Sequence, residues 1–177
     1  MIANYSLRCV SWIVIVLVAS VLHAEARHAR SGSVVVMTRN LYVGADILRI
    51  VEVESPSDIP LVVAETLETV RRSQPAERMA AIADEIAKRK PHLVGLQEAF
   101  QIKTQFPGDF FIGNPHPAEY VEVDYLELLL GALEDRGLHY RVAAALANID
   151  VELPGFAGLG PMGEPLFMDV RVVEISC

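Results

Sequence analysis

The sequence predicts an α/β fold, in which helices pack on a β-sheet. Short apolar runs rich in β-branched residues alternate with longer segments that are apolar at every third or fourth position. The chain has 177 residues, of which 52% are hydrophobic and 21% are charged, so it is long and apolar enough for one globular domain. No internal repeat is visible in it.

The first predicted strand covers Ser33 to Met37, which reads Ser-Val-Val-Val-Met and places Asn40 just past its end. A continuous β-branched run of this kind is typical of a strand covered on both faces. A second apolar run, His92 to Leu96, places Glu98 in the same way. Ligands of α/β sheets bind at the carboxyl ends of the strands, so both side chains are candidates for a site. A glutamate in such a position can equally be a solvated loop residue or a salt-bridge partner.

Three helices are predicted. The first begins at Ser57-Asp58-Ile59-Pro60, because proline is tolerated in a first turn. The second runs from Pro75 to Arg89, and the third begins at a capping box of Asp124 and Glu127 and stops at Gly137. Their apolar stripes are Val62, Val63, Leu67 and Val70; Met79, Ile82, Ala83, Ile86 and Ala87; and Leu126, Leu129, Leu130 and Leu133.

Two further strands are predicted, from Tyr140 to Ala147 and from Phe167 to Val173. Between Ala99 and Val123 the chain is rich in Pro, Gly and Phe, which predicts a long loop. This loop either shapes a substrate entrance beside Glu98 or is a surface excursion. The glycines from Gly155 to Gly160 do not have the spacing of a dinucleotide-binding fingerprint, and they predict a flexible loop.

Other polar residues are weaker candidates. Asp46 either approaches Asn40 after a turn at Gly44 or caps a helix that begins at Ile47. Three histidines lack partners at metal-ligand spacing and are predicted to be solvated or edge residues: His92, His116 and His139.

The motifs taken together resemble a known family. Thr38-Arg39-Asn40-Leu41, a helix with Glu77-Arg78, and Lys90-Pro91-His92-Leu93-Val94-Gly95-Leu96-Gln97-Glu98 look like the opening of the endonuclease/exonuclease/phosphatase superfamily. The resemblance spans about Val34 to Arg171 and implies, over residues 34–177, the N-terminal half of a four-layer α/β/β/α sandwich. In that family the Asn helps to hold the scissile phosphate and the Glu binds a divalent metal. Carried over by position, the catalytic and metal-binding roles fall to Asn40 and Glu98, with Mg²⁺ or Mn²⁺ as cofactor.

The resemblance implies hydrolysis of phosphodiester or phosphomonoester bonds by an activated water, with the metal polarising the phosphoryl oxygen. Carboxylate and amide oxygens suit magnesium, which is a hard cation. The family's later Asp-x-Asn and Asp-His elements, which include its general base, have no counterpart in this sequence. We therefore expect a C-terminally truncated, inactive domain. The alternative is a non-catalytic remnant or binding module that retains half of the metal and phosphate site.

The N-terminal segment predicts export. Arg8 precedes an apolar run from Val10 to Leu22, and Ala24-Glu25-Ala26 follows it, which is the pattern of a signal peptide over residues 1–26. Residues 27–33 would then be a linker. The run is shorter than the ~20 apolar residues of a spanning helix, so we expect a secreted or periplasmic protein with no stable membrane span after cleavage. The alternative is a membrane anchor formed by residues 10–22.

The net charge and the cysteine content limit the possible binding partners and disulfide bonds of the chain. Cleavage would remove one basic and one acidic residue, so the net charge would stay at −8, and no dense basic stripe for nucleic acid appears. The phosphoester substrate stays open between a lipid, a small molecule and a nucleic acid. Cys9 would leave with the signal peptide, so Cys177 would have no intramolecular disulfide partner. A half domain would also leave one sheet face uncovered, which predicts poor solubility or a homo-oligomer formed through that apolar face.

Overall fold

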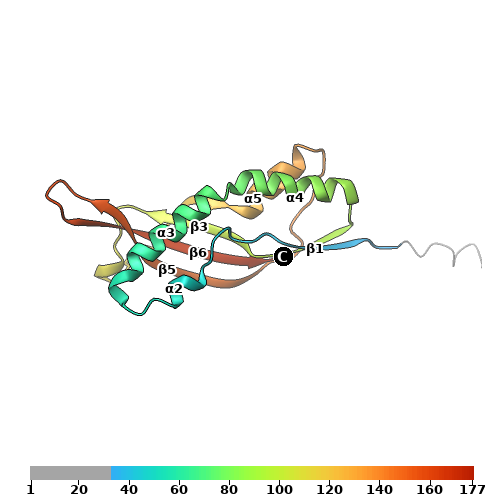
Figure 1. The fold of residues 1–177 in the computed structure, drawn as a ribbon. Helices are drawn as coiled ribbons and strands as arrows, with labels where there is room; N and C mark the ends of the chain where they lie inside the picture. Colours follow the sequence, from blue (N-terminus) through green and yellow to red (C-terminus); the bar gives the residue numbers. More distant parts are fainter. Residues whose placement is uncertain (1–32) are drawn as a thin grey trace, which may run out of the picture. The chain divides into compact units, whose positions relative to one another are not determined.

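The computed structural model describes residues 33–177, which contain a compact unit from Val35 to Cys177 (Figure 1). The fold of these residues is mixed α/β, with two sheets and four α-helices. The expected signal peptide lies outside the described residues, and so does the expected linker apart from Ser33. No helix within residues 33–177 combines the length and the apolar character that a membrane crossing requires.

The first sheet, which we name sheet A, consists of two parallel strands. β1 (Val36–Asn40) pairs with β2 (Leu93–Gln97), and Asn40 lies opposite Gln97. Both strands were predicted, but β1 lies further along the chain than expected, so Asn40 is its last residue. The prediction that β1 is covered on both faces is wrong. Val36 is 60% exposed and Leu93 is 56% exposed, because helices cover only the opposite face of sheet A within the described residues.

The three predicted helices are confirmed as α3 (Ile59–Arg72), α4 (Pro75–Arg89) and α5 (Tyr125–Glu134). The Asp124 carboxylate accepts a hydrogen bond from the Glu127 amide at 3.0 Å, as a capping residue should. Gly137 adopts a φ of 71°, and the Leu138 amide donates to the Leu133 carbonyl, which completes a Schellman ending. The helix from Ile47, which was one of the two alternatives for Asp46, is present as α2 (Leu48–Val51). Two 3₁₀ turns were not predicted: η1 (Pro56–Asp58) and η2 (Phe110–Ile112).

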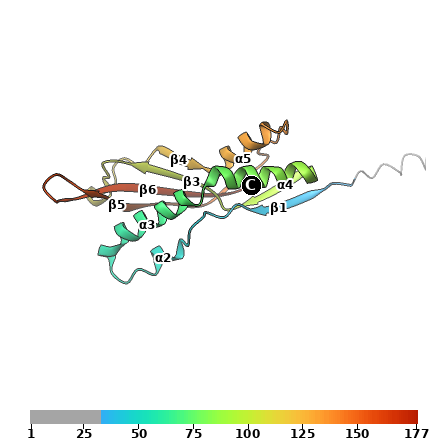
Figure 2. The ribbon, with the colours of Figure 1, turned by 45° about the horizontal axis from the view of Figure 1, so that its top comes forward.

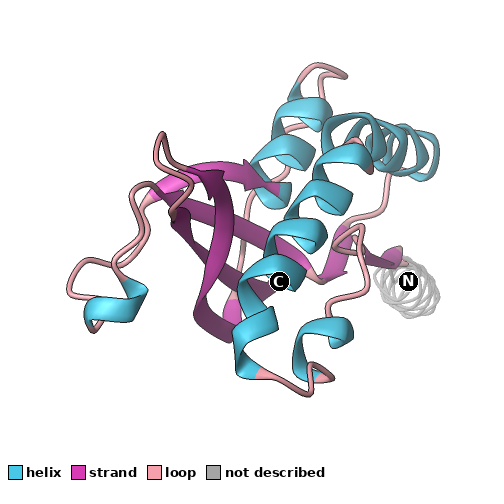
Figure 3. Cartoon of the chain, turned by 60° about the vertical axis from the view of Figure 1, so that its left-hand side comes forward, coloured by secondary structure: helices cyan, strands magenta, loops and turns pink. Residues whose placement is uncertain are grey.

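The second sheet, sheet B, is antiparallel with the strand order β4-β3-β6-β5 (Figure 2). Its strands are β3 (Ala99–Gln105), β4 (Tyr120–Asp124), β5 (Leu146–Leu159) and β6 (Pro165–Ser176). Helix α3 packs against β5, and α5 packs against β3 and α4. Helices α3 and α5 therefore lie on one face of sheet B, where the hydrophobic core forms (Figure 3).

Three sequence predictions fail in sheet B. The segment from Ala99 to Val123 is not one long loop, because it contains β3 and most of β4. The strand predicted from Tyr140 to Ala147 begins only at Leu146, and the loop predicted from Gly155 to Gly160 is largely the end of β5. Long antiparallel pairing between β5 and β6 overrides the local glycine signal. At Gly155 the glycine serves close packing, because a Cβ there would lie 3.2 Å from Met168.

The face of sheet B that points away from the helices carries a charged pair. Because side chains alternate along a strand, Lys103 and Arg171 point away from the core that contains Ile102 and Val172. The Arg171 guanidinium donates to both oxygens of Asp150, at 2.7 Å each, and this hydrogen bonding lowers the pKa of Asp150.

The open apolar face of sheet A gives a first prediction. We expect Leu93→Lys to weaken self-association of the chain by at least about tenfold, because it removes an apolar contact that each copy would bury. Leu61→Lys is the matched control, since Leu61 is 53% exposed on α3 and Leu93 is 56% exposed. Light scattering behind a sizing column measures the association. A wild-type chain that stays monomeric at every concentration would contradict the prediction.

Candidate functional site

The two motif residues lie together at one edge of sheet A. Asn40 ends β1 and Glu98 directly follows β2, and parallel strands end on the same side of a sheet. The Asn40 Nδ2 donates to the Glu98 Oε1 at 2.6 Å, which joins two positions 58 residues apart. The fold therefore places an amide and a carboxylate in direct contact where α/β sheets bind ligands.

Glu98 occupies a constrained position. It is the one residue between β2 of sheet A and β3 of sheet B, and the chain changes sheet there. Its φ is 54°, in the left-handed region that glycine adopts without cost and glutamate does not. A non-glycine residue in this region stores about 1 kcal/mol or more of strain, and such residues are enriched at functional sites. The half-buried Glu98 side chain is thus aimed by the backbone and by Asn40 together.

Asn40 also orders the loop that follows β1. Its Oδ1 accepts from the Tyr42 amide at 2.7 Å, so the side-chain amide bridges Tyr42 and Glu98. A carboxamide has two lone pairs and two hydrogens, and each bond uses one of them. Asn40 therefore retains one acceptor site for a cation and one N–H for a phosphate oxygen.

Arg78 of α4 holds this loop in place. Its guanidinium donates to the carbonyls of Leu41 and Tyr42 and to Ser73 Oγ. The same guanidinium lies over two aromatic rings, 5.4 Å from the centroid of Tyr42 and 5.7 Å from that of Tyr125. Helix α4 and the loop are thereby joined by a planar group that matches several acceptors at once.

Tyr125 and Gly44 also hold the loop after β1 against the helices. Tyr125 is fully buried, and its hydroxyl donates to the Val43 carbonyl. Burial raises the pKa of Tyr125, so its hydroxyl remains a donor at neutral pH. Gly44 has a φ of 94°, and a Cβ there would lie 2.2 Å from Ser73 Oγ. Only glycine fits this approach of the loop to the helices.

Glu98 lines a cavity of about 440 Å³ that the loop after β1 forms with sheet B. Its lining residues are Tyr42, Val43, Ala45, Asp46, Ile47, Leu48, Glu98, Phe100 and Glu174. The cavity thus combines three carboxylates with apolar and aromatic side chains, and its lining includes no histidine, lysine or arginine.

The sequence identified only part of this lining. Asp46 lines the cavity with Glu98, and its Oδ1 accepts from the Leu48 amide at 3.1 Å, although Ile47 and not Asp46 is the N-cap of α2. Glu174 was not predicted. It lies in β6 opposite Phe100, and only the pairing of β3 with β6 brings it to the site. No local sequence signal marks such a long-range neighbour.

The donor atoms fit a hard cation. Within residues 33–177 no three His, Cys, Asp or Glu side chains are grouped closely enough to hold a metal ion by themselves. Mg²⁺ commonly uses one or two carboxylates together with waters and substrate phosphate oxygens. Glu98 and the amide oxygen of Asn40 match this arrangement.

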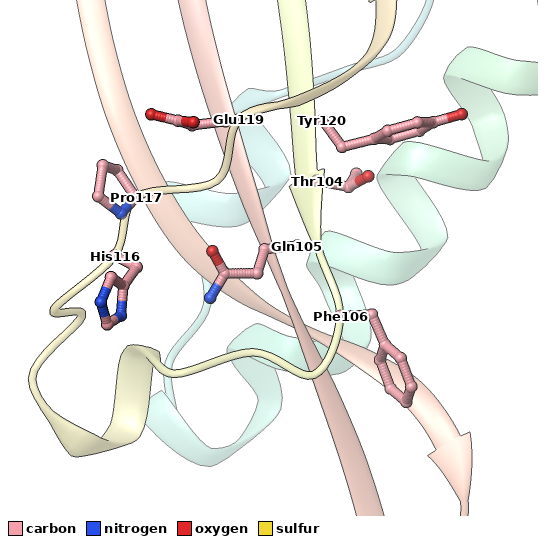
Figure 4. A pocket seen from close by; sticks show the side chains of 7 residues that line it. All are labelled: Thr104, Gln105, Phe106, His116, Pro117, Glu119 and Tyr120. Carbon is pink, nitrogen blue, oxygen red and sulfur yellow. The ribbon is translucent and has the colours of Figure 1, made fainter.

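The described histidines lie elsewhere. His92 Nδ1 accepts from the Val35 amide at 3.0 Å, and His116 Nδ1 lies 3.3 Å from Asp109 Oδ2, so His116 has an acidic neighbour that its sequence context did not suggest. His116 lines a separate cavity of about 630 Å³ between the end of β3 and the start of β4. In Figure 4 the Gln105 side chain points toward His116, whereas the Tyr120 ring points away from it.

The site therefore consists of the hydrogen-bonded side chains of Asn40 and Glu98. Glu98 lines a cavity that also contains the carboxylates of Asp46 and Glu174. Such a group can bind a hydrated divalent cation and one phosphate oxygen at the same time.

Comparison of the chain with protein-family models, with curated proteins and with solved structures found no match.

Proposed function

We propose that the chain carries one side of the active site of an exported, Mg²⁺- or Mn²⁺-dependent phosphoesterase of the endonuclease/exonuclease/phosphatase superfamily. Glu98 is the metal ligand, and Asn40 orients the phosphate. The observation that supports this proposal is the 2.6 Å hydrogen bond between these two residues at the carboxyl ends of parallel strands. Each residue was a candidate from its own motif, and the fold joins them.

The donor and acceptor atoms that the bond between Asn40 and Glu98 leaves unused define the proposed roles of the two side chains. A divalent cation bound there would polarise the phosphoryl oxygen and stabilise charge on the leaving oxygen. Glu98 Oε1 accepts from Asn40, which leaves Oε2 to face a cation. The second Nδ2 hydrogen of Asn40 would donate to a phosphate oxygen and fix its orientation. Asp46, across the same cavity, would accept a hydrogen bond from a water of the cation's shell.

In this proposal residues 34–177 form part of a four-layer α/β/β/α sandwich, and a further layer covers the open face of sheet A. The exposed apolar side chains of Val36 and Leu93 support such a cover. The outer face of sheet B carries the ion pair of Arg171 and Asp150, and the loop between β3 and β4 covers part of it through its contacts with Asp169. In the proposed sandwich, sheet A therefore supplies the apolar face on which the further layer packs.

A second candidate is a binding module that holds a metal and a phosphoester without hydrolysing it. In this alternative the carboxylates of the cavity lining hold the cation, and none of them acts as a general base. We therefore expect cation and phosphoester binding without appreciable turnover by the chain alone. The substrate stays open between lipid, small-molecule and nucleic-acid phosphoesters, so the assay must include all three.

Metal binding tests the site directly. We expect the chain to bind Mn²⁺, and we expect Glu98→Gln to weaken binding by at least about tenfold because it removes the charged ligand. Electron paramagnetic resonance of free Mn²⁺ measures the binding, and Mg²⁺ should compete for the same site. Glu54→Gln is the matched control, since it removes one exposed carboxylate outside the cavity lining. Equal Mn²⁺ affinity in Glu98→Gln and Glu54→Gln would refute the assignment.

Turnover separates the two candidate functions. Hydrolysis of aryl phosphodiesters and phosphomonoesters, phospholipid and oligonucleotide is measured with Mg²⁺, for the wild type and for Glu98→Gln. Turnover that depends on Glu98 would favour the enzyme, and Mn²⁺ binding without turnover would favour the binding module. Hydrolysis that survives Glu98→Gln would come from another site or from a contaminant.

A further inference from the structure

Sheet B supplies a second wall of the cavity that Glu98 lines. Glu174 of β6 belongs to the same lining, and it lies opposite Phe100 of β3 in the antiparallel register. Residues that lie directly opposite each other in a sheet point to the same face, so Glu174 shares the face of Phe100, which is part of the core. A half-buried carboxylate therefore stands on the helix-facing side of sheet B, in the same cavity as Glu98.

An irregularity in β5 holds this carboxylate. The pairing of β5 with β6 shifts its register between Ala147 and Ile149, which leaves Asn148 as an extra residue. Such bulges bend a strand and re-aim a side chain, and they are frequent next to active sites. The Asn148 Nδ2 donates to Ser176 Oγ at 2.8 Å and to Glu174 Oε1 at 3.3 Å. One amide group therefore ties together two side chains of β6.

These bonds determine which oxygen of Glu174 stays free. Ser176 and Glu174 are two residues apart in β6, so they share one face, and they use both Nδ2 hydrogens of Asn148. The Glu174 Oε1 accepts one of them, while Oε2 accepts no hydrogen bond from any group of residues 33–177. Glu174 thus lines the cavity with one oxygen fixed and the other available.

We propose that Glu174 is a second, water-mediated anchor of the divalent cation that Glu98 binds, and that Asn148 is the residue that positions it. This inference rests on the proposed function, because it concerns the same cation. The contact goes through water because Mg²⁺ keeps several waters in protein sites, and no three acidic or histidine side chains of residues 33–177 are grouped closely enough to ligate one ion. Groups that hydrogen-bond the ligands of a metal raise its affinity.

Asn148 would act only through Glu174. Its amide carries no charge, and it is not part of the cavity lining. A glutamate side chain loses rotamer freedom when it is fixed in one orientation, and this loss opposes binding of the cation if it occurs at that moment. The hydrogen bond from Asn148 fixes Glu174 before the cation arrives. Asn148 is therefore a positioning residue and not a ligand.

The affinity for Mn²⁺, measured by electron paramagnetic resonance, tests the role of Glu174. We expect Glu174→Gln to weaken Mn²⁺ binding by about threefold to tenfold, because it removes a negative charge near the cation. Glu174→Asp keeps the charge and should recover part of the loss. Glu119→Gln is the matched control, since it removes an exposed carboxylate outside this cavity lining and should leave the affinity unchanged.

Pulsed electron paramagnetic resonance in D₂O counts the waters bound to Mn²⁺ and tests whether the contact goes through water. We expect the same count in the wild type and in Glu174→Gln, because Glu174 accepts from a bound water and does not replace one. One additional water in the variant would make Glu174 a direct ligand and would overturn the water-mediated contact.

A double-mutant cycle tests the role of Asn148. We expect Asn148→Ala to weaken Mn²⁺ binding by about threefold in the wild-type background and to have no effect in the Glu174→Gln background, because two residues that act as one unit are not additive. Asn148→Ser, which keeps a short hydroxyl donor in the bulge, replaces the alanine variant if circular dichroism shows that the latter is not fully folded. Equal losses in both backgrounds would overturn the positioning role.

The Glu98→Gln variant separates failure of this inference from failure of the proposed function. If Glu98→Gln weakens Mn²⁺ binding while Glu174→Gln matches Glu119→Gln, the cation site stands and the role of Glu174 is overturned. If Glu98→Gln leaves the affinity unchanged as well, the proposed cation site is itself wrong, and the roles of Glu174 and Asn148 fall with it.

Discussion

Replacing Asp169 with alanine is expected to lower the free energy of unfolding by about 3 kcal/mol. Asp169 is fully buried in β6, and its Oδ2 accepts from the amides of Asp109 at 2.6 Å and Phe110 at 3.2 Å. It holds the loop between β3 and β4, which approaches so closely that a Cβ on Gly108 would lie 2.6 Å from Asp169 Oδ1. Alanine would leave these amides without their acceptor and would leave a void beside them.

Urea unfolding followed by circular dichroism measures this loss. Asp169→Asn should cost less, about 1 to 2 kcal/mol, because it keeps one acceptor oxygen but turns an NH₂ group toward backbone donors. Asp58→Ala removes an exposed carboxylate and should stay within about 0.5 kcal/mol of the wild type. If Asp169→Ala were as stable as Asp58→Ala, the buried carboxylate would not be what holds the loop.

Helices were predictable because their signals are local. For α4, the sequence contains proline in the first turn, an apolar stripe at helical spacing and basic residues in the last turn, and both predicted ends agree with the structure. For α5, the capping carboxylate of Asp124 and the left-handed Gly137 lie within a few residues of the ends that they mark. These signals require no knowledge of distant residues.

The strands of sheet B depended on partners far away in the sequence. In β3 the alternation of Phe100, Ile102 and Thr104 is a strand signal, but the prolines and glycines that follow it favoured a loop. The end of β5 contains Gly155 and Gly158, and its pairing with β6 keeps it extended despite them. Local propensity was outweighed there by pairing that the local sequence does not encode.

The residues of the candidate site also differ in whether the local sequence predicts them. Asn40 and Glu98 were identifiable because each stands at the end of a short apolar run inside a motif. Glu174 was not, since it reaches the cavity through the register of β6 with β3. Arg78 was part of the Glu77-Arg78 motif, but its contact with Leu41, which links helix α4 to a loop 37 positions earlier, was not predicted. Sequence motifs can identify residues that bind, whereas residues that position them emerge from the fold.

Arg78→Met tests that positioning role and is the second large effect that we expect. The substitution keeps the length of the side chain but removes hydrogen bonds to two carbonyls and to Ser73 Oγ, together with the stacking on Tyr42 and Tyr125. The expected loss in the free energy of unfolding is about 2 to 3 kcal/mol, because the loop acceptors lose their donor. The loop after β1 would also lose its attachment to α4. We therefore expect weaker Mn²⁺ binding in the variant while it is still fully folded.

Arg78→Lys distinguishes geometry from charge. Lysine keeps the positive charge but cannot present a planar fork to two carbonyls and a hydroxyl at once, so most of the loss in stability and in Mn²⁺ affinity should remain. Arg89→Met, at an exposed position of the same helix, should change neither quantity by more than a small amount. Full recovery of both quantities in Arg78→Lys would show that charge alone suffices. A stable Arg78→Met variant with unchanged Mn²⁺ affinity would instead show that Asn40 and Glu98 hold their geometry without the contact from α4.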